Sequence, residues 1–403
     1  MTRASGLPRG RADGYNTTLM NVLFISCNYP LTSTLFCQRL AEHGASVLGI
    51  GDVPEPLLAA NLRESLRAYR YVPDMNDLEA MKRTARELRD HFGPIDRVDS
   101  NIEHWLPTEA AIRAELHVPG LTPDYLAYAR SKIGMKKMFA DAGVPLMAGI
   151  STADKDRVRE FAMFHGFPLF FKPDTGVGSL GTFRVDSLAE LEAKLESIPP
   201  NYVAEPFIRG RILTFDGLAD RDGEVFYCTC HTYKAVAELI RENGDAHIYS
   251  FRQLPPGIEE MGRRTVKAFG IRERFFHIEF FETAPGEYYA LEMNLRAPGS
   301  TVLHLMNYAA DIDVFAVWAR LLIHGDNRLQ YERKYHAAHV ARRDHLRYRH
   351  DHGAVLSRLG PALVNHARLP VEDRAGLGDE CYIIRHADFD ELQRMIAFIE
   401  EKA

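Results

Sequence analysis

The chain has 403 residues, of which 46% are hydrophobic and 26% charged, and its formal net charge is −6. This length allows about two or three globular domains, and the mildly acidic balance gives no electrostatic reason to expect a nucleic-acid partner, whose usual signature is a strongly basic face. Five scattered cysteines without zinc-ligand spacing favour a reduced, cytoplasmic protein. The longest apolar runs are far shorter than the roughly 20 residues of a membrane helix, so no membrane partner is expected.

The N-terminal part of the chain predicts an α/β unit. Residues 1–19 lack the apolar stretch of a secretory signal and are predicted to be a flexible arm. Beyond them, a strand at 21–26, a helix at 33–44 and a strand at 45–52 predict a doubly wound domain over residues 20–117. No G-x-G-x-x-G sequence follows its first strand, so a dinucleotide site is not expected there.

The central part of the chain alternates helices and strands. After the turn-rich stretch "HVPGLTPD", the pattern predicts a helix at 125–143, strands at 167–173, 183–185 and 201–208, and a helix at 187–198. Further strands are predicted at 212–220, 224–234 and 274–282, with a helix at 257–270. Residues 301–325 have helical spacing, and a mixed α/β tail follows Tyr331.

Two acidic residues are predicted to face each other across a hairpin. The strands "RFFHIEFFE" and "EYYALEMN" flank the turn Pro285-Gly286, and a two- or four-residue loop pairs Glu279 with Glu292. Like charges in a directly opposed pair repel, so a cation is expected between them.

Two more polar residues extend this face, because strand side chains alternate. Asn294 adds an oxygen, and carboxylate and amide oxygens suit Mg²⁺. Arg296 would hold an anion beside the metal. The alternative is a hairpin whose charged face is merely solvated, although apolar residues on both faces of the first strand argue against it.

A glycine-rich loop follows the strand that ends at Lys172. The sequence "DTGVGSLGT" would let backbone N–H groups close over phosphate oxygens while Lys172 supplies positive charge. It lacks the ending of a P-loop, and an ordinary turn between two strands is the alternative. The stretch "YVAEPFIRG" follows, and its backbone could recognise a purine edge with Glu205 bonded to an amino group; an ordinary strand end is the alternative.

In this order, the stretches "ARSKIGMKKMFADAGVP", "FPLFFKPDTGVGSLGTFRV", "VAEPFIRG" and "FFHIEFFETAPGEYYALEMNLRAPG" resemble the ATP-grasp superfamily. The nearest branches are the amino-acid ligases, biotin carboxylases and carbamoyl-phosphate synthases, and the resemblance covers about residues 120–300. It implies an α/β and α+β protein with a doubly wound pre-ATP-grasp domain at 20–117. A two-lobed ATP-grasp domain would span 118–325, with its lid at about 133–204, followed by a C-terminal α/β subdomain at 326–403.

The resemblance also implies a role for each matching residue. The implied cofactors are ATP and Mg²⁺, with two ions expected and Mn²⁺ as a substitute. Arg296 and Lys172 would be catalytic, and Glu279, Glu292 and Asn294 would be the metal ligands. ATP would be bound by Lys132, Lys172, Thr175, Gly176, Gly178, Ser179, Gly181, Glu205, Phe207 and Ile208. One departure concerns the ribose: Arg211 and Ile212 stand where many members have an acidic residue, and Asp216 is a weak substitute.

The implied activity is ATP-dependent joining of a carboxylate to an amine or amino acid through an acyl phosphate, with release of ADP and phosphate. One alternative phosphorylates bicarbonate, as in carboxylases and carbamoyl-phosphate synthesis. Another is a regulatory module that binds ATP without catalysis. The expected partners are small molecules, and a homodimer is one assembly to test.

Two other stretches have competing interpretations. Residues 339–353, "HVARRDHLRYRHDHG", could contact an anionic substrate, but a solvated face is favoured. Cys228 and Cys230 lie near His231, but strand alternation places His231 on the opposite face. Small buried cysteines are therefore favoured over a metal site.

Overall fold

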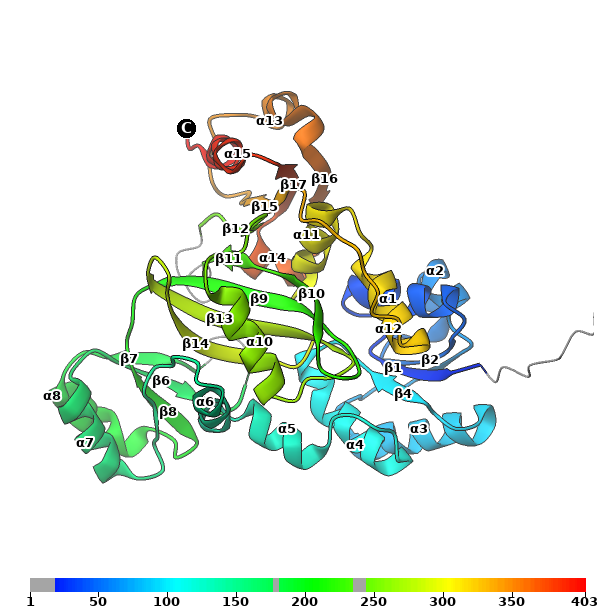
Figure 1. Ribbon diagram of the computed structural model, residues 1–403, viewed down its shortest axis with the longest axis horizontal. Helices are drawn as coiled ribbons and strands as arrows, with labels where there is room; N and C mark the ends of the chain where they lie inside the picture. The colour runs from blue at the N-terminus through cyan, green and yellow to red at the C-terminus, as the bar shows by residue number, and fades with distance from the viewer. Residues whose placement is uncertain (1–18, 177–180, 235–243) are drawn as a thin grey trace, which may run out of the picture.

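The computed structural model describes residues 19–176, 181–234 and 244–403. The predicted arm at residues 1–19 lies outside this range except for Leu19. Figure 1 shows three sheet-containing parts: a parallel sheet at the N-terminal end, a small sheet at the opposite side, and a large sheet that carries the C-terminal helices above it. The fold is α/β and α+β, as predicted.

The N-terminal sheet is parallel, with strand order β3-β2-β1-β4. All five residues of its inner strand β1 are buried, as expected for a strand covered on both faces. The strands are β1 (Asn21–Ile25), β2 (Ser46–Gly51), β3 (Ala68–Tyr71) and β4 (Arg97–Asp99), and the helices are α1 (Leu31–Glu42), α2 (Ala60–Ser65), α3 (Leu78–Phe92) and α4 (Leu106–Leu116), with 3-10 turns η1 (Glu55–Leu57) and η2 (Glu103–Trp105).

The two faces of this sheet belong to different hydrophobic clusters. Leu23 and Ile25 pack with buried residues of α3 and α4. On the other face, Phe24 packs with Phe36 of α1 and with Trp318 of α12 (Val314–His324), whose ring is edge-on to both. The N-terminal sheet therefore shares a core with a helix from the later part of the chain.

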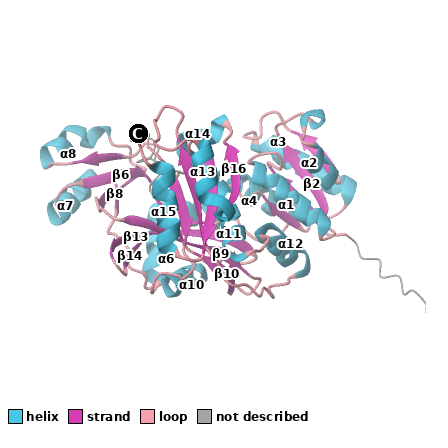
Figure 2. Cartoon of the chain, turned by 90° about the horizontal axis from the view of Figure 1, so that it is seen from above, coloured by secondary structure: helices cyan, strands magenta, loops and turns pink. Residues whose placement is uncertain are grey.

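A second sheet is antiparallel and has its own core. Its strand order is β5-β8-β6-β7, and its hydrophobic cluster consists of residues between 150 and 204. Figure 2 shows it at the end of the molecule opposite the N-terminal sheet. The strands are β5 (Ile150–Ser151), β6 (Leu169–Pro173), β7 (Phe183–Val185) and β8 (Tyr202–Pro206), and the helices are α7 (Lys155–His165) and α8 (Leu188–Lys194), the latter followed by η3 (Leu195–Ser197).

The third sheet joins the central and C-terminal parts of the chain. Its order is β14-β13-β9-β11-β12-β15-β17-β16, with β10 paired to β9. Its strands are β9 (Arg211–Ala219), β10 (Val225–Thr229), β11 (His231–Tyr233), β12 (His247–Ser250), β13 (Arg274–Ala284), β14 (Glu287–Asn294), β15 (His336–Arg342), β16 (Leu363–Arg368) and β17 (Glu380–His386). Because β12 and β15 are hydrogen-bonded neighbours, the strands after residue 325 continue the sheet that contains the Glu279 hairpin.

The helix predicted at 125–143 is wrong in one respect, because two helices form there. Ser131 adopts an extended conformation, and its hydroxyl accepts a hydrogen bond from the backbone N–H of Gly134, so it caps a new helix. The helices are α5 (Pro123–Arg130) and α6 (Lys132–Asp141). The break places Lys132 at the first position of α6.

Of the remaining helices, α10 (Ile258–Ala268), α11 (Ser300–Ala310) and α15 (Phe389–Glu400) pack against strands of the large sheet. Residues 301–325 form two helices, because Asp311 ends the first in a left-handed conformation and Asp313 caps the second. The helices not yet named are α13 (His352–Leu359) and α14 (Val371–Leu377), with η4 (Gly360–Ala362).

No helix in the described part of the chain combines the length and apolarity that crossing a membrane requires.

Candidate active site

The predicted acidic pair forms. Glu279 on β13 and Glu292 on β14 are register partners, and Asn294 is paired with His277 two residues away on the same face. On its other side β13 is paired with β9, where Glu279 lies opposite Thr214 and His277 opposite Asp216. One face of the neighbouring strands β14, β13 and β9 therefore carries a row of polar side chains.

The hairpin reaches this pairing through two irregularities that cancel. Counting from the turn, the register first shifts at Thr283, which is an extra residue on β13. It shifts back at Leu291, an extra residue on β14, just before Glu279 meets Glu292. Between the two shifts, Phe280 lies opposite Ala290. The predicted pair is confirmed, although the uniform ladder assumed for it is not.

The two carboxylates lie in different electrostatic surroundings. Burial, and then the charge of Glu279, raise the pKa of Glu292. Burial also acts to raise the pKa of Glu279, but hydrogen bonds from His277 and Tyr233 outweigh it and lower that pKa. The Nζ of Lys132 lies 3.9 Å from Glu292 Oε1, with its own pKa lowered by burial. A further cation between the two carboxylates would relieve their repulsion.

A buried hydrogen-bond network holds the carboxylate of Glu279 in place. His277 Nδ1 is 2.5 Å from Asp216 Oδ1, and its Nε2 is 3.3 Å from Glu279. The Tyr233 hydroxyl donates to Glu279 at 2.6 Å. Burial opposes a charge on His277, but Asp216 outweighs it and raises the pKa of His277 to about 9. With both ring nitrogens bonded to carboxylates, the imidazole is held as a cation that orients Glu279.

Asp216 itself is fully buried and accepts hydrogen bonds from His231, His277 and Thr214. Its burial acts to raise its pKa, but the two histidines hold that pKa well below the ordinary value. A carboxylate so enclosed is not placed to bind a ribose, so the weak substitute suggested by the sequence is not supported. His231 does face away from Cys228 and Cys230, which are buried, as predicted.

Glu205 bridges two lysines. It lies on β8 with its carboxylate buried, 2.8 Å from Lys172 Nζ and 2.8 Å from Lys136 Nζ. Lys136 lies one helical turn after Lys132 and also donates to the carbonyl of Met147 at 2.7 Å. Burial lowers the pKa of Lys136. Burial acts to raise the pKa of Glu205, but Lys172 and Lys136 outweigh it and lower that pKa. The sequence analysis did not identify Lys136, although its spacing from Lys132 was a usable signal.

The glycine-rich loop begins against α6. The backbone N–H of Lys132 donates to the carbonyl of Asp174 at 2.9 Å, and the Nζ of Lys132 is 3.5 Å from the carbonyl of Gly176. Thr175, Gly176 and Gly181 are described, and both glycines have positive φ. The predicted phosphate contacts Gly178 and Ser179 lie outside the described residues.

The predicted adenine linker follows β8. Phe207 lies beside Phe170, with ring centroids 6.3 Å apart, and the Arg184 guanidinium is 4.6 Å from the Phe207 centroid. Ile208 is half-buried after it. These contacts leave the proposed adenine role as a prediction.

Arg296 lies two residues after the end of β14, at the end of the row of polar side chains. Its Nη1 donates to the carbonyl of Ala297 at 2.8 Å, and its Nη2 is 3.5 Å from Asn294 Oδ1. On its other side, Nε is 3.6 Å from Glu103 Oε2, a carboxylate that the sequence analysis did not identify. Glu103 also accepts from Arg130 at 2.8 Å. The N-terminal unit thus contributes a residue to the edge of the site.

Comparison with known proteins decides the fold. No family model matches the chain. The solved L-amino acid ligase of Bacillus licheniformis superposes with a TM-score of 0.70 at 18% identity, covering 94% of this chain and 96% of that one. The chain has the ATP-grasp fold. The biotin carboxylase domain of Hydrogenobacter thermophilus 2-oxoglutarate carboxylase, solved with MgADP and bicarbonate, gives a TM-score of 0.66 at 15% identity, covering 96% and 90%.

Sequence comparison also finds an amino acid ligase, at low identity. The L-arginine-specific L-amino acid ligase of Bacillus subtilis is 22% identical over 269 residues, which is 64% of this chain. The chain spans 65% of the length of that relative. In this chain the paired carboxylates and the amide of Asn294 are oxygen ligands, and the adjacent lysines are cations, of the kinds that suit a magnesium nucleotide.

Proposed function

We propose that the chain is an ATP-dependent carboxylate-amine ligase that forms an amide or peptide bond and releases ADP and phosphate. The observation that supports it most is the opposed pair Glu279 and Glu292, with Lys132 beside it and Arg296 at its end. In this proposal Glu279, Glu292 and Asn294 hold one or two Mg²⁺ ions, which when bound would offset charge on the transferring phosphoryl group. Mn²⁺ would replace Mg²⁺ with the same ligands.

The lysines would hold the nucleotide phosphates. Lys132 and Lys172 are buried, and a phosphate would compete with Glu292 and Glu205 for them. The loop from Thr175 to Gly181 would cover the phosphates, and the linker at Glu205, Phe207 and Ile208 would hold adenine. Because Glu205 forms ion pairs with Lys172 and Lys136, its carboxylate would hold those lysines in place as well as accept a hydrogen bond from the purine amino group.

The chemistry takes two steps. A carboxylate oxygen of the substrate attacks the γ-phosphorus of ATP, the bond to the β-γ bridging oxygen breaks, and ADP and an acyl phosphate form. The amine nitrogen then attacks the acyl carbon, the carbon-oxygen bond to phosphate breaks, and the amine loses a proton. Arg296 would stabilise the oxyanion that develops on the acyl carbon.

A panel assay tests this proposal. Purified chain is incubated with Mg²⁺ and ATP over a range of carboxylates, each with and without a set of amino acids, and ADP, phosphate and the condensed product are measured. Release of ADP and phosphate in equal amounts with an amide product supports the ligase. Tight ATP binding without ADP release in every mixture would instead indicate a regulatory module.

A second candidate phosphorylates bicarbonate, and the similarity to a biotin carboxylase domain solved with bicarbonate and MgADP favours keeping it in the panel. Bicarbonate-dependent ADP release without any organic carboxylate would make it the better proposal. The cytoplasmic location, the homodimer and the domain boundaries stay predictions.

A further inference from the structure

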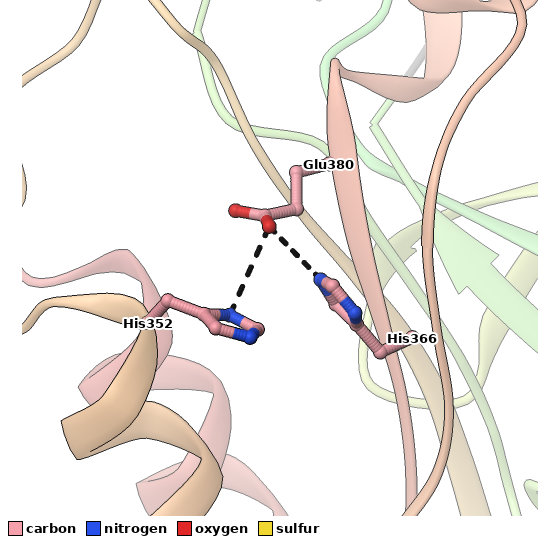
Figure 3. Close-up of side chains that lie close together, drawn as sticks. All are labelled: His352, His366 and Glu380. Atoms are coloured by element: carbon pink, nitrogen blue, oxygen red, sulfur yellow. Dashed lines mark hydrogen bonds and ion pairs between the residues drawn. The ribbon is translucent and has the colours of Figure 1, made fainter.

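Three potential metal ligands meet at the far edge of the large sheet. His352 is the first residue of α13, His366 lies on β16 and Glu380 begins β17, and Figure 3 shows their side chains converging. One donor atom from each lies within 4.8 Å of the other two. His366 Nε2 is 2.9 Å from Glu380 Oε1, and His352 Nδ1 is 3.8 Å from the same oxygen.

The local fold explains why they converge. β16 and β17 are antiparallel, with His366 opposite Tyr382 and Arg368 opposite Glu380, so His366 and Glu380 are diagonal neighbours on one face. Asp351 caps α13 by accepting the N–H of Ala354 at 2.7 Å, which sets the start of the helix above this face. Three separate elements therefore supply the three side chains.

The spacing fits a tetrahedral ion. With metal-to-ligand bonds of about 2.0–2.1 Å, the edges of a tetrahedron are about 3.3 Å long. The two separations from Glu380 Oε1, 2.9 and 3.8 Å, bracket this value, and all three donor atoms lie within 4.8 Å of one another, so small side-chain shifts would form the site. Two imidazoles and one carboxylate suit Zn²⁺, whereas Mg²⁺ prefers oxygen ligands alone.

Tyr382 supplies the supporting contacts that such sites use. Its hydroxyl donates to the second carboxylate oxygen, Glu380 Oε2, at 3.1 Å, which leaves Oε1 facing the histidines. The same hydroxyl is 2.9 Å from His352 Nδ1, a hydrogen bond that an ion on this nitrogen would replace, and the Tyr382 ring lies 4.9 Å from the His366 ring. The Tyr382 side chain is buried, so its contacts with Glu380 and His366 hold those two side chains in place.

The cluster is open to solvent on one side. The side chains of His352, His366 and Glu380 are 45%, 28% and 22% exposed, so an ion can reach them and keep one position for water or another ligand. The edge strand β16 is seven strand intervals from β14, or about 34 Å along the sheet, which separates it from the ATP site.

We propose that His352, His366 and Glu380 bind one Zn²⁺ ion, independently of the magnesium nucleotide. The ion would join α13 to β16 and β17 and stabilise this edge of the sheet. The proposal gives a role to part of the His-rich stretch that the sequence analysis predicted to be a solvated face. That prediction is wrong for its first half, since His339, Arg342 and Arg343 are buried.

The test uses the full chain without an affinity tag, freed of metal by a chelator. Zn²⁺ is titrated in competition with a chromophoric chelator, with excess Mg²⁺ and no nucleotide present. We expect one tight equivalent of Zn²⁺, an affinity at least 100-fold weaker in His366→Gln and Glu380→Gln, and about tenfold weaker in Tyr382→Phe. All five cysteines are buried and should not compete.

Two controls make the result specific. His350 forms a comparable pair with Glu401 at 2.9 Å, but this pair belongs to no group of three potential ligands among the described residues. The variant His350→Gln should therefore bind Zn²⁺ like the wild type. Glu292→Gln, in the ATP site, should also leave Zn²⁺ binding unchanged. Absence of a tight equivalent, or equal affinity in the wild type and the ligand variants, would overturn the proposal.

A spectroscopic measurement on the wild-type chain tests the site even if the ligand variants do not fold. Co²⁺ added to the wild-type chain should give the intense visible absorption of a four-coordinate site, and Zn²⁺ should displace it. Only the weak absorption of six-coordinate Co²⁺ would count against the site.

Discussion

Glu279 and Glu292 are directly opposed across β13 and β14, yet their surroundings drive their pKa values in opposite directions. His277 and Tyr233 bond Glu279 and keep it ionised, while burial and the charge of Glu279 favour the protonated form of Glu292. The pair therefore has one carboxylate held by the protein and one whose charge needs a cation. This asymmetry separates the roles of the two residues.

The Glu292→Gln substitution should abolish ADP release while leaving the fold intact. Removing one of two opposed charges relieves repulsion, so we expect an unchanged or higher melting temperature together with at least a 100-fold lower rate of ADP formation. A coupled ADP assay and differential scanning fluorimetry measure the two effects. Turnover near the wild-type rate in the presence of Mg²⁺ would rule out the metal assignment.

The Asp216→Asn substitution should destabilise the protein, because it leaves the buried His277 cation without its carboxylate. Breaking a buried pair in this way costs about 3 kcal/mol or more. The exposed Asp222 is the matched control, and Asp222→Asn should change stability by less than about 0.5 kcal/mol. Urea unfolding followed by circular dichroism compares them, and equal midpoints for the two variants would show that the network is not stabilising.

A glycine on α10 should be intolerant of alanine although the helix alone would favour the change. A Cβ at Gly262 would lie within 2.6 Å of three atoms of the Phe215 ring, which stacks on Phe276 with centroids 5.5 Å apart. Helix propensity favours alanine by about 1 kcal/mol, but overpacking a core costs about 1–3 kcal/mol. We expect net destabilisation, seen as a lower melting temperature.

Gly353 on α13 is the matched control, since its added Cβ would have only an ordinary contact at 3.5 Å with Asp351. Gly353→Ala should leave the melting temperature unchanged or raise it. A Gly262→Ala variant as stable as Gly353→Ala would mean that α10 can move away from β9 at little cost.

Acid should weaken the protein through His339. Burial lowers the pKa of His339 to about 4 from an ordinary 6.5, with a smaller effect from His247, and His339 Nε2 is 3.1 Å from the carbonyl of Leu377. Because the unfolded chain binds the proton more readily, the stabilisation is complete above about pH 6.5 and is lost as pH falls toward 4. The full effect is about 3 kcal/mol.

The measurement compares the wild type with His339→Gln, which keeps an N–H donor but does not titrate. The difference between their unfolding free energies should shrink as pH falls from 6.5 to 4. Parallel pH profiles would show that another group causes any acid lability.

The pairing of Glu279 with Glu292 could be predicted from the sequence, although the strand register between them and the turn is not the one assumed. The prediction assumed an uninterrupted ladder from the Pro285-Gly286 turn, whereas Thr283 and Leu291 each add a residue, one on each strand. Equal insertions on both strands restore the original partners, so a single bulge would have defeated the same argument. Nothing in the local pattern marks either position.

The residues missed fall into two kinds. Lys136 and His277 had readable signals, since Lys136 lies one helical turn from Lys132 and His277 lies two strand positions from Glu279. Tyr233 had none, and Asp216 was considered only for the ribose, because both residues reach the site from β11 and β9 and only tertiary strand pairing brings them there. The break at Ser131 was also missed, because apolar spacing continues across it while the side chain caps a new helix.

The pairing of β12 with β15 limits how this protein can be divided. Truncating the chain at residues 326–335 would remove β15, the neighbour of β12, and expose the row of backbone N–H and C=O groups on β12. Such an open edge recruits strands from other molecules, so fragments ending near residue 325 would be prone to aggregate. The segment from residue 336 onward thus covers a strand edge of the sheet that carries Glu279 and Glu292, and truncated forms of the protein should not end at this junction.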